Sequence, residues 1–290
     1  MSSWEEIADQ IAPMGAPAPG LATGANRRRK TGDAGSAIAG ALGAERFLES
    51  PRVPANAAPD AAWNGVEMSG GNGPFYLVDQ PTTFFDPCSA DLRTRLEAAL
   101  TNPPSRWLEG LAPEDLLFCD IETTGLSSAE PLFLIGTMRF VGKEPRLQLY
   151  LARHPNEEKA ILEAFGAHLR GKTLVTFNGK SFDWPFIEGR ATRNLVRLAK
   201  PQGHYDLLFS ARRRYRSQLP NCRLQTLEAG ICKRGRRGDI PSSRIPDQYY
   251  DFLDMAEAPG GGASLLAPVI FHCALDVLTM AELICCMAEN

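Results

Sequence analysis

The stretch Leu116-Leu117-Phe118-Cys119-Asp120-Ile121-Glu122-Thr123-Thr124-Gly125-Leu126 decides the fold of this chain. Its first four residues are apolar, which predicts a buried β-strand, and Gly125 predicts a turn directly after it. Asp120 and Glu122 are two positions apart, so on a strand both carboxylates point to the same face. They lie at the carboxyl end of the predicted strand, where sites tend to form in α/β sheets.

Two carboxylates on one face of a strand repel each other unless a cation lies between them. Their oxygen atoms are hard ligands of the kind that suits Mg²⁺ or Mn²⁺. The alternative is an exposed strand end that carries two solvated acids, and the pattern Asp-x-Glu taken alone favours that alternative. The apolar strand before the pair and the turn after it favour a metal site instead.

The surrounding chain predicts an α/β fold. We expect a hairpin over residues 131–151 with a turn at Gly142-Lys143-Glu144, then a helix capped by Asn156 and ended by Gly171. A strand over residues 173–177, the turn Asn178-Gly179 and another helix follow. The other expected elements are a short strand at 75–78 and helices at about 90–100, 206–217, 224–231, 246–257 and 264–287. Three strands in a meander, followed by alternating helix and strand, predict a mixed β-sheet with helices packed on it.

Asp183 is a third candidate acid, and it lies at the opening of the helix that follows Asn178-Gly179. The alternative role for an aspartate at this position is to cap the helix. The backbone N–H groups at the same helix start could bind an anion such as phosphate.

His272 and Asp276 are four residues apart on a predicted helix and therefore share one face. A lone histidine among apolar residues is usually a core or boundary residue, but an aspartate there is harder to explain without a cation or a donor. The four acids come from three segments and could together hold two divalent cations. His272 would then be placed to deprotonate the attacking water.

Three motifs resemble, in order, those of the DEDD 3′→5′ exonucleases of the ribonuclease H-like superfamily. The first is Asp120 to Leu126, the second is Thr176 to Pro185 (TFNGKSFDWP), and the third is His272-x-x-x-Asp276. The chain most resembles the YprB-type ribonuclease H-like domain family, from about residue 75 to residue 287. Further marks of that family lie at residues 204–213, 219–228, 239–241 and 245–246.

The resemblance implies a role for each candidate. Asp120, Glu122 and Asp276 are implied as direct ligands of two Mg²⁺ or Mn²⁺ ions, with Asp120 bridging both. Asp183 is implied to hold the second ion partly through water, and His272 is implied as the general base. The residues expected to contact the substrate are Thr123, Asn178, Lys180, Arg212 and Arg213.

Two features depart from the superfamily pattern. His272 has the spacing to Asp276 that is usual where a tyrosine replaces the histidine, although this combination is usual in the YprB-like group. A glycine-rich stretch normally follows the first motif, and here the residues are Ser127-Ser128-Ala129-Glu130-Pro131. We therefore expect altered substrate contacts at that point.

Residues 1–74 differ from the rest of the chain in composition. Alanine, glycine and proline fill 34 of these 74 positions, and the aromatic residues among them are Trp4, Phe47 and Trp63. Such a segment cannot bury enough apolar surface to offset its chain entropy, so we expect a largely disordered arm. The ribonuclease H-like domain is expected over residues 75–290, with residues 75–112 as its N-terminal extension.

Charge is segregated along the chain, although the formal net charge is only −3. Residues 193–237 carry twelve Lys and Arg against Asp206 and Glu228, whereas residues 238–290 carry eight acids against Arg244. The first segment, here called the basic belt, could face nucleic acid. The alternative is a solvated helix face that the acidic segment neutralises.

Composition excludes several protein classes. With 44% hydrophobic and 22% charged residues, the 290-residue chain as a whole is not disordered, collagen-like or a coiled coil. Neither a secretory signal nor a membrane span is expected. The seven cysteines are scattered and form no Cys-x-x-Cys, which favours a reducing cytoplasm over a zinc site or a disulfide framework.

We therefore expect a metal-dependent nuclease, and specifically a 3′→5′ exonuclease that acts on single-stranded DNA or RNA. The alternatives are a structure-selective endonuclease with the same site and a nucleic-acid-binding or scaffolding module without catalysis. The intact set of acids argues against the last. No separate nucleic-acid-binding domain is visible in the sequence, so a protein partner could supply specificity.

Overall fold

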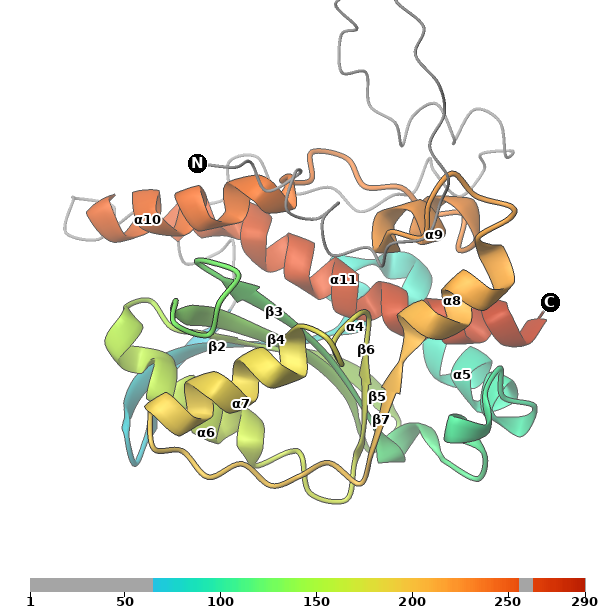
Figure 1. The fold of residues 1–290 in the computed structure, drawn as a ribbon, viewed down its shortest axis with the longest axis horizontal. Coiled ribbons are helices and arrows are strands. Elements are labelled where there is room, and N and C mark those ends of the chain that lie inside the picture. Colours follow the sequence, from blue (N-terminus) through green and yellow to red (C-terminus); the bar gives the residue numbers. More distant parts are fainter. Residues whose placement is uncertain (1–64, 256–262, 290) are drawn as a thin grey trace, which may run out of the picture.

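Seven strands form one mixed β-sheet in residues 65–255 and 263–289, the part of the chain that the computed structural model describes (Figure 1). The strand order across the sheet is β1-β2-β5-β4-β3-β6-β7. β3 pairs in parallel with β6, and β6 with β7, whereas the other neighbours are antiparallel. The strands are β1 (Val66–Gly70), β2 (Gly73–Pro81), β3 (Leu116–Thr123), β4 (Leu132–Val141), β5 (Glu144–Leu151), β6 (Thr173–Thr176) and β7 (Gly203–Asp206).

Helices cover both faces of the sheet (Figure 1). One face packs against α6 (Glu158–Gly166) and α7 (Asp183–Arg193). The other packs mainly against the long helix α11 (Ala263–Glu289) and the elements around it. These are α4 (Thr82–Phe85), α5 (Leu92–Thr101), α8 (Leu207–Tyr215), α9 (Leu224–Gly230) and α10 (Ile245–Met255). The 3₁₀ helices are η2 (Pro87–Ser89), η3 (Arg106–Leu108), η4 (Pro113–Asp115), η5 (Pro155–Glu157) and η6 (Ser242–Arg244).

β3 is apolar on both faces because it lies inside the sheet, with β4 on one side and β6 on the other. Leu117, Cys119 and Ile121 join the hydrophobic core beneath α6 and α7. Leu116 and Phe118 join the core beneath α11. By the same alternation, Asp120 and Glu122 continue the α11 side of the strand. The strand therefore directs both carboxylates at α11.

α11 is the central helix of the larger core. By length and composition alone its segment Ser264–Glu289 could cross a membrane, but 94% of the apolar stretch is buried inside the protein. A continuous apolar surface is what a helix needs when the sheet, α5, α9 and α10 all pack against it. The buried position explains the hydropathy of α11.

Gly136 allows α11 to approach the sheet closely. A Cβ atom at this position of β4 would lie 2.5 Å from the Cys273 Sγ and 3.1 Å from the Val277 Cγ2. Any larger residue would therefore push α11 away at the turn that carries Cys273 and Asp276. Gly136 is paired with Asp120 across β3 and β4, so this close approach occurs beside the first acid of the predicted site.

The predicted α/β fold is confirmed, including the hairpin, the strand after it and the helices. Two strands were not predicted. β7 contains only four residues, Gly203-His204-Tyr205-Asp206, which is too few to show a hydrophobic period. β1 is exposed at every position and has no apolar face that could reveal it in the sequence.

The start of the ordered domain was also placed too late. β1 and the beginning of β2 precede Phe75, because the backbone pairing of β1 with β2 orders residues that bury little side-chain surface. The expected disorder of residues 1–64 lies outside the described residues. The helix cap is a smaller correction: the His154 side chain, not that of Asn156, accepts from a backbone N–H at the start of η5, and α6 ends at Gly166, before Gly171.

We predict that Gly136→Ala destabilises the protein by about 1–3 kcal/mol, because the added methyl group overpacks the contact between β4 and α11. Cys273→Ala in the same protein frees the space, so the double variant should be more stable than the sum of the two single changes by at least about 0.5 kcal/mol. Urea unfolding of the four proteins measures this coupling. Gly71→Ala is the matched control, since a Cβ there meets nothing within 4 Å; additive effects at 136 and 273 would contradict the packing argument.

Candidate metal centre and active site

A cavity of about 580 Å³ opens where β3, the β6–α7 turn, α8 and α11 meet. Asp120 and Glu122 enter it from β3, Asp183 from the start of α7, and His272 and Asp276 from α11. The structure thus brings together all five residues for which the sequence predicted a catalytic or metal-binding role. Their shared position follows from the topology, because parallel β3 and β6 end at the same edge of the sheet.

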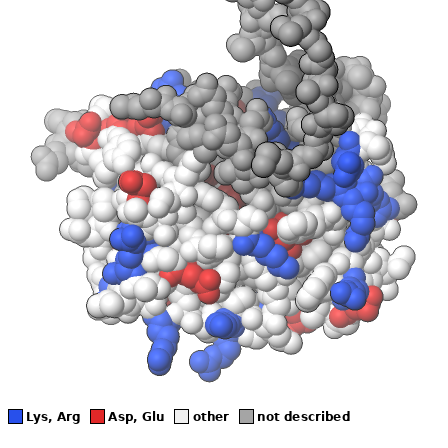
Figure 2. All heavy atoms as spheres, viewed as in Figure 1, with Lys and Arg blue, Asp and Glu red and all other residues white. Residues whose placement is uncertain are grey.

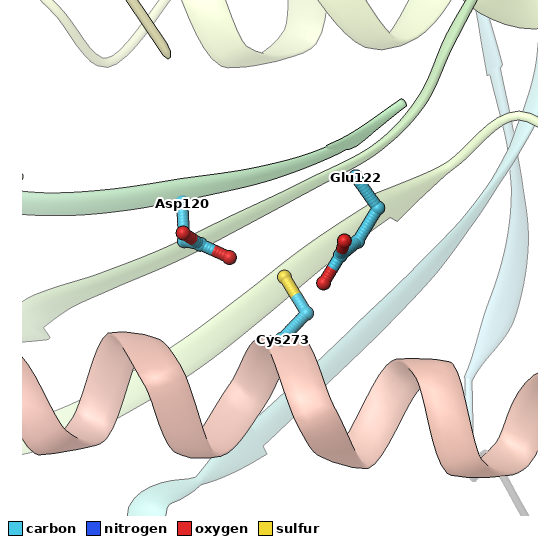
Figure 3. A group of neighbouring side chains, drawn as sticks. All are labelled: Asp120, Glu122 and Cys273. Carbon is cyan, nitrogen blue, oxygen red and sulfur yellow. The ribbon is translucent and has the colours of Figure 1, made fainter. Parts of the chain in front are cut away.

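Asp120 and Glu122 point from β3 toward α11, and Cys273 points back from the helix (Figure 3). One ligand atom from each of these three residues lies within 4.8 Å of the others. Burial raises the pKa of the Cys273 thiol well above its usual 9, so Cys273 behaves as a small packed group facing Gly136. The two carboxylates are the members of this group with the chemistry for a hard cation.

Burial and mutual repulsion raise the pKa values of the clustered acids. For Asp120, burial is the larger cause, and the charges of Asp276, Glu122 and Asp183 add to it. Burial likewise raises the pKa of Glu122 to about 8. The pKa of Asp183 rises to about 7, chiefly through burial and against the opposing effect of backbone hydrogen bonds. Without a cation, the site therefore favours partly protonated carboxyl groups.

Arg236 supplies a positive charge to this cluster. Its guanidinium Nη2 lies 2.5 Å from the Asp276 Oδ1, and its Nε lies 2.7 Å from the Glu228 Oε2. The Arg236 side chain is 5% exposed, and these carboxylates hold its pKa above the usual value in spite of burial. Asp276, which lines the cavity with the other acids, is therefore ion-paired with a buried arginine.

His272 is held between two carboxylates. Its Nδ1 lies 2.9 Å from the Asp239 Oδ1, and its Nε2 lies 3.5 Å from the Asp276 Oδ2. Burial alone lowers the pKa of His272, but Asp276, Asp239 and Glu122 outweigh it and raise the pKa to about 9. Asp239 thus fixes the ring orientation and leaves Nε2 on the side of the acids.

Asp206 shapes the turn that leads to Asp183. Its carboxylate accepts from the backbone N–H groups of Asn178 (2.9 Å) and Lys180 (3.0 Å), and it caps α8 through the Leu208 N–H (3.1 Å). Asn178 has a φ of 66°, a left-handed conformation that asparagine tolerates better than most residues. A Cβ at Gly179 would lie 2.4 Å from the Thr176 side chain, so the tight turn requires glycine there.

The expected substrate contacts divide between two cavities. Thr123, Asn178 and Arg212 line the cavity that holds the acids, and the Thr123 hydroxyl donates to the Gly125 carbonyl at 2.7 Å. Lys180 and Arg213 line the adjoining cavity.

The basic belt is not one continuous exposed surface. Arg234 and Arg236 are buried in ion pairs, and Arg214 donates to the Met287 carbonyl at 2.6 Å. Figure 2 shows Lys and Arg side chains gathered at the right of the molecule, where α8 lies in Figure 1. On α8 the exposed arginines are Arg212 and Arg213.

Residues 117–288, more than half of the chain, match the model of the RNase H superfamily. The chain belongs to the RNase H superfamily. Over 186 residues it is 33% identical to the protein YprB of Bacillus subtilis (strain 168). This match covers 63% of this chain and 44% of YprB. The chain thus spans less than half the length of that relative. These matches confirm the YprB-type ribonuclease H-like domain that the motifs predicted.

Among solved structures, the family B DNA polymerase from the archaeon Pyrobaculum calidifontis is similar to this RNase H-like chain with a TM-score of 0.46 and 18% sequence identity. The match covers 60% of this chain and 25% of the polymerase chain.

The donor set of this RNase H-like domain fits divalent cations. Asp120, Glu122, Asp183 and Asp276 supply oxygen ligands from three segments, and Glu122 and Asp183 are themselves buried. Arg236 and His272 offset only part of their combined negative charge when all four are ionised. A nuclease-type domain with a candidate acidic metal site is therefore what the fold and the cavity establish.

Arg236, Asp239 and Cys273 belong to the site but were not predicted as site residues. Asp239 lies in one of the stretches that resemble the YprB-type family, and this resemblance could have identified it as a candidate site residue. Arg236 lies in the run Arg234-Gly235-Arg236-Arg237, where nothing in the sequence separates a buried arginine from an exposed one. Cys273 directly follows His272 on α11 and comes into the cluster through the close approach at Gly136.

We predict that Mn²⁺ raises the melting temperature of the wild type and much less that of Asp120→Ala. One bound ligand at a hundred times its dissociation constant raises the free energy of unfolding by roughly 2.7 kcal/mol. For a protein of this size, each kcal/mol raises the melting temperature by roughly 2–4 °C. Differential scanning fluorimetry with and without Mn²⁺ measures both shifts, and equal shifts would remove Asp120 from the ligand set. Without metal, Asp120→Ala should be no less stable than the wild type, because it removes one repelling charge.

We predict that the metal-free wild type loses stability relative to Glu122→Gln as the pH rises from 5 to 8.5. The pKa of Glu122 is raised from 4.5 to about 8 in the folded protein, so between these values the folded state holds a proton that the unfolded state has lost. Raising the pH through this window therefore favours unfolding, by a difference on the order of 4 kcal/mol. Urea unfolding in EDTA at several pH values measures this, and parallel curves for the two proteins would contradict it.

Proposed function

We propose that this chain is a metal-dependent nuclease, and specifically a 3′→5′ exonuclease that hydrolyses phosphodiester bonds of single-stranded DNA or RNA with two Mg²⁺ or Mn²⁺ ions. The observation that carries the proposal is the single cavity in which Asp120, Glu122, Asp183 and Asp276 meet beside His272. Membership of the RNase H superfamily supports phosphodiester chemistry. The 3′→5′ direction rests on the resemblance of the three motifs to the DEDD exonucleases.

The four carboxylates would hold the ions, with Asp120 at the centre of the set. Its charge interacts with those of the other three acids, which supports the bridging role that the motif resemblance implies for it. When bound, two such ions stabilise the charge on the attacking and leaving oxygens of an in-line displacement. Binding of the ions would require Asp276 either to leave its ion pair with Arg236 or to contact both Arg236 and a cation.

His272 would accept the proton of the attacking water. It must be neutral for this role, whereas the carboxylates around it raise its pKa to about 9. Asp276 and Glu122, two of the three carboxylates that cause this rise, are the groups proposed to hold cations. Neutralising them removes much of the cause, so the histidine of the loaded enzyme would titrate closer to its ordinary range.

Purified protein and 5′-end-labelled DNA and RNA oligonucleotides test the proposal in Mg²⁺ or Mn²⁺. A ladder that shortens by one nucleotide at a time supports the exonuclease. Discrete internal cuts would establish the endonuclease alternative, and retardation without cleavage would establish a binding module. Asp120→Ala is the control for a contaminating nuclease, since it should be inactive at every metal concentration.

We predict that His272→Ala keeps the Mn²⁺ melting shift but loses at least roughly a hundredfold in turnover, as is usual when a general base is removed. The wild-type rate should rise with pH as the histidine deprotonates, and the variant should lack this limb. Asp239→Asn should keep the limb and shift it to lower pH, because one carboxylate that raises the histidine pKa is gone. Near-wild-type turnover in His272→Ala would eliminate the histidine as base while leaving the metal site in place.

A further inference from the structure

A second cavity of about 630 Å³ adjoins the site. It lies between the segment 103–107, which follows α5, and the start of α8. Phe209 lines both this cavity and the one that holds the acids. Lys180, two residues after Asn178 of the acid-lined cavity, also lines it. The two cavities therefore form neighbouring parts of one surface track.

Two large aromatic side chains are exposed along this track. Trp107 is 55% exposed and Phe209 is 58% exposed, on elements far apart in the sequence. The apolar faces of such large rings are unfavourably exposed to water, so a partner that covers them gains free energy. An unpaired nucleobase is such a partner, because it stacks on an aromatic ring whatever its sequence.

Cations surround the same rings. The Lys180 Nζ lies 5.3 Å from the centroid of the Trp107 ring, and the Arg106 Cζ lies 5.8 Å from it. Arg213 of α8 lines the cavity near Phe209. Interleaved aromatic rings and cations are the usual composition of a groove for single-stranded nucleic acid.

The floor of the cavity does not oppose an anion. Among the described residues that line it, Asp206 is the single acid, and three backbone N–H groups already occupy its carboxylate. The remaining polar groups of the floor are hydroxyls, including that of Tyr205, which donates to the Ser210 Oγ at 2.9 Å. The cavity thus combines a cationic rim with a floor that carries no unpartnered acid.

We propose that this cavity binds unpaired nucleotides of a DNA or RNA strand on the 5′ side of the scissile phosphate. The bases stack on Trp107 and Phe209, and the phosphates lie near Lys180, Arg213 and Arg106. The strand then passes Phe209 into the acid-lined cavity. The 5′ direction rests on the proposed exonuclease, whereas the binding of an unpaired strand does not. Paired bases cannot stack on these rings, which makes single-stranded nucleic acid the expected ligand.

Fluorescence anisotropy with 5′-fluorescein-labelled decathymidylate and decauridylate tests the proposal in EDTA, where no hydrolysis occurs. Trp107→Ala and Phe209→Ala should each weaken binding of at least one strand by roughly tenfold, within the range for loss of one stacked base. Trp107→Phe keeps an aromatic ring and should recover most of the affinity. Lys180→Gln and Arg213→Gln should instead flatten the dependence of log Kd on log salt concentration, by roughly one unit of slope each.

Tyr250→Ala is the matched control, since Tyr250 is 47% exposed on α10 and lines neither cavity. It should bind both oligonucleotides as the wild type does. Wild-type affinity in both Trp107→Ala and Phe209→Ala, with melting temperatures unchanged, overturns the proposal. Failure of the wild type to bind either strand overturns it as well.

The outcome is separate from that of the nuclease assay. Lost binding in the aromatic variants with no cleavage by the wild type would keep this site and discard the proposed exonuclease. Cleavage by the wild type with unaltered binding in the aromatic variants would keep the exonuclease and discard this site.

Discussion

The mutual repulsion of four carboxylates in one partly buried cavity is the constraint on which the rest of the site depends. Asp120, Glu122 and Asp183 all have raised pKa values, chiefly because they are buried away from water and further because they lie close to other acids. Such a cluster stays fully ionised only if positive charge reaches it, and otherwise it takes up protons. In the protein alone this charge comes from Arg236 and His272, and with cations bound it would come from the metal. The same repulsion that weakens the metal-free fold would thus contribute to the affinity for a cation at the proposed site.

A buried network of ion pairs holds Arg236, one of these positive charges, beside the acids. Glu228 pairs with Arg234 through one oxygen and with Arg236 through the other, at 2.6 and 2.7 Å. Arg234 also pairs with Asp86 at 3.0 Å. Buried pairs of this kind add little net stability, but removing one partner leaves an uncompensated charge. The network therefore fixes the position of the segment 228–239 against α11, and with it the positions of Arg236 and Asp239 beside the site.

The sequence predicted those parts of the molecule whose information is local. The apolar run before Asp120 and the turn after Glu122 located β3, and residue spacing placed His272 and Asp276 on one face of α11. It did not reveal β1 and β7, which are recognisable only from their pairing with neighbouring strands. It also could not separate Arg236 from the exposed arginines of the basic belt, because burial of a charge depends on partners such as Glu228 and Asp276 that are distant in sequence. Contacts between distant segments are the information that a single sequence carries least directly.

The close contact of α11 with Gly136 joins two parts of the site that lie far apart in the chain. The β3–β4–β5 meander is made of hairpins between consecutive strands, so it can form early. Asp276 reaches Asp120 only when α11 docks, which closes a very long loop of chain. A folding intermediate that contains the sheet but not the docked helix would hold Asp120 and Glu122 without Asp276, the proposed ligand that α11 contributes. The capacity to bind metal would therefore appear late, as a marker that the core beneath α11 is complete.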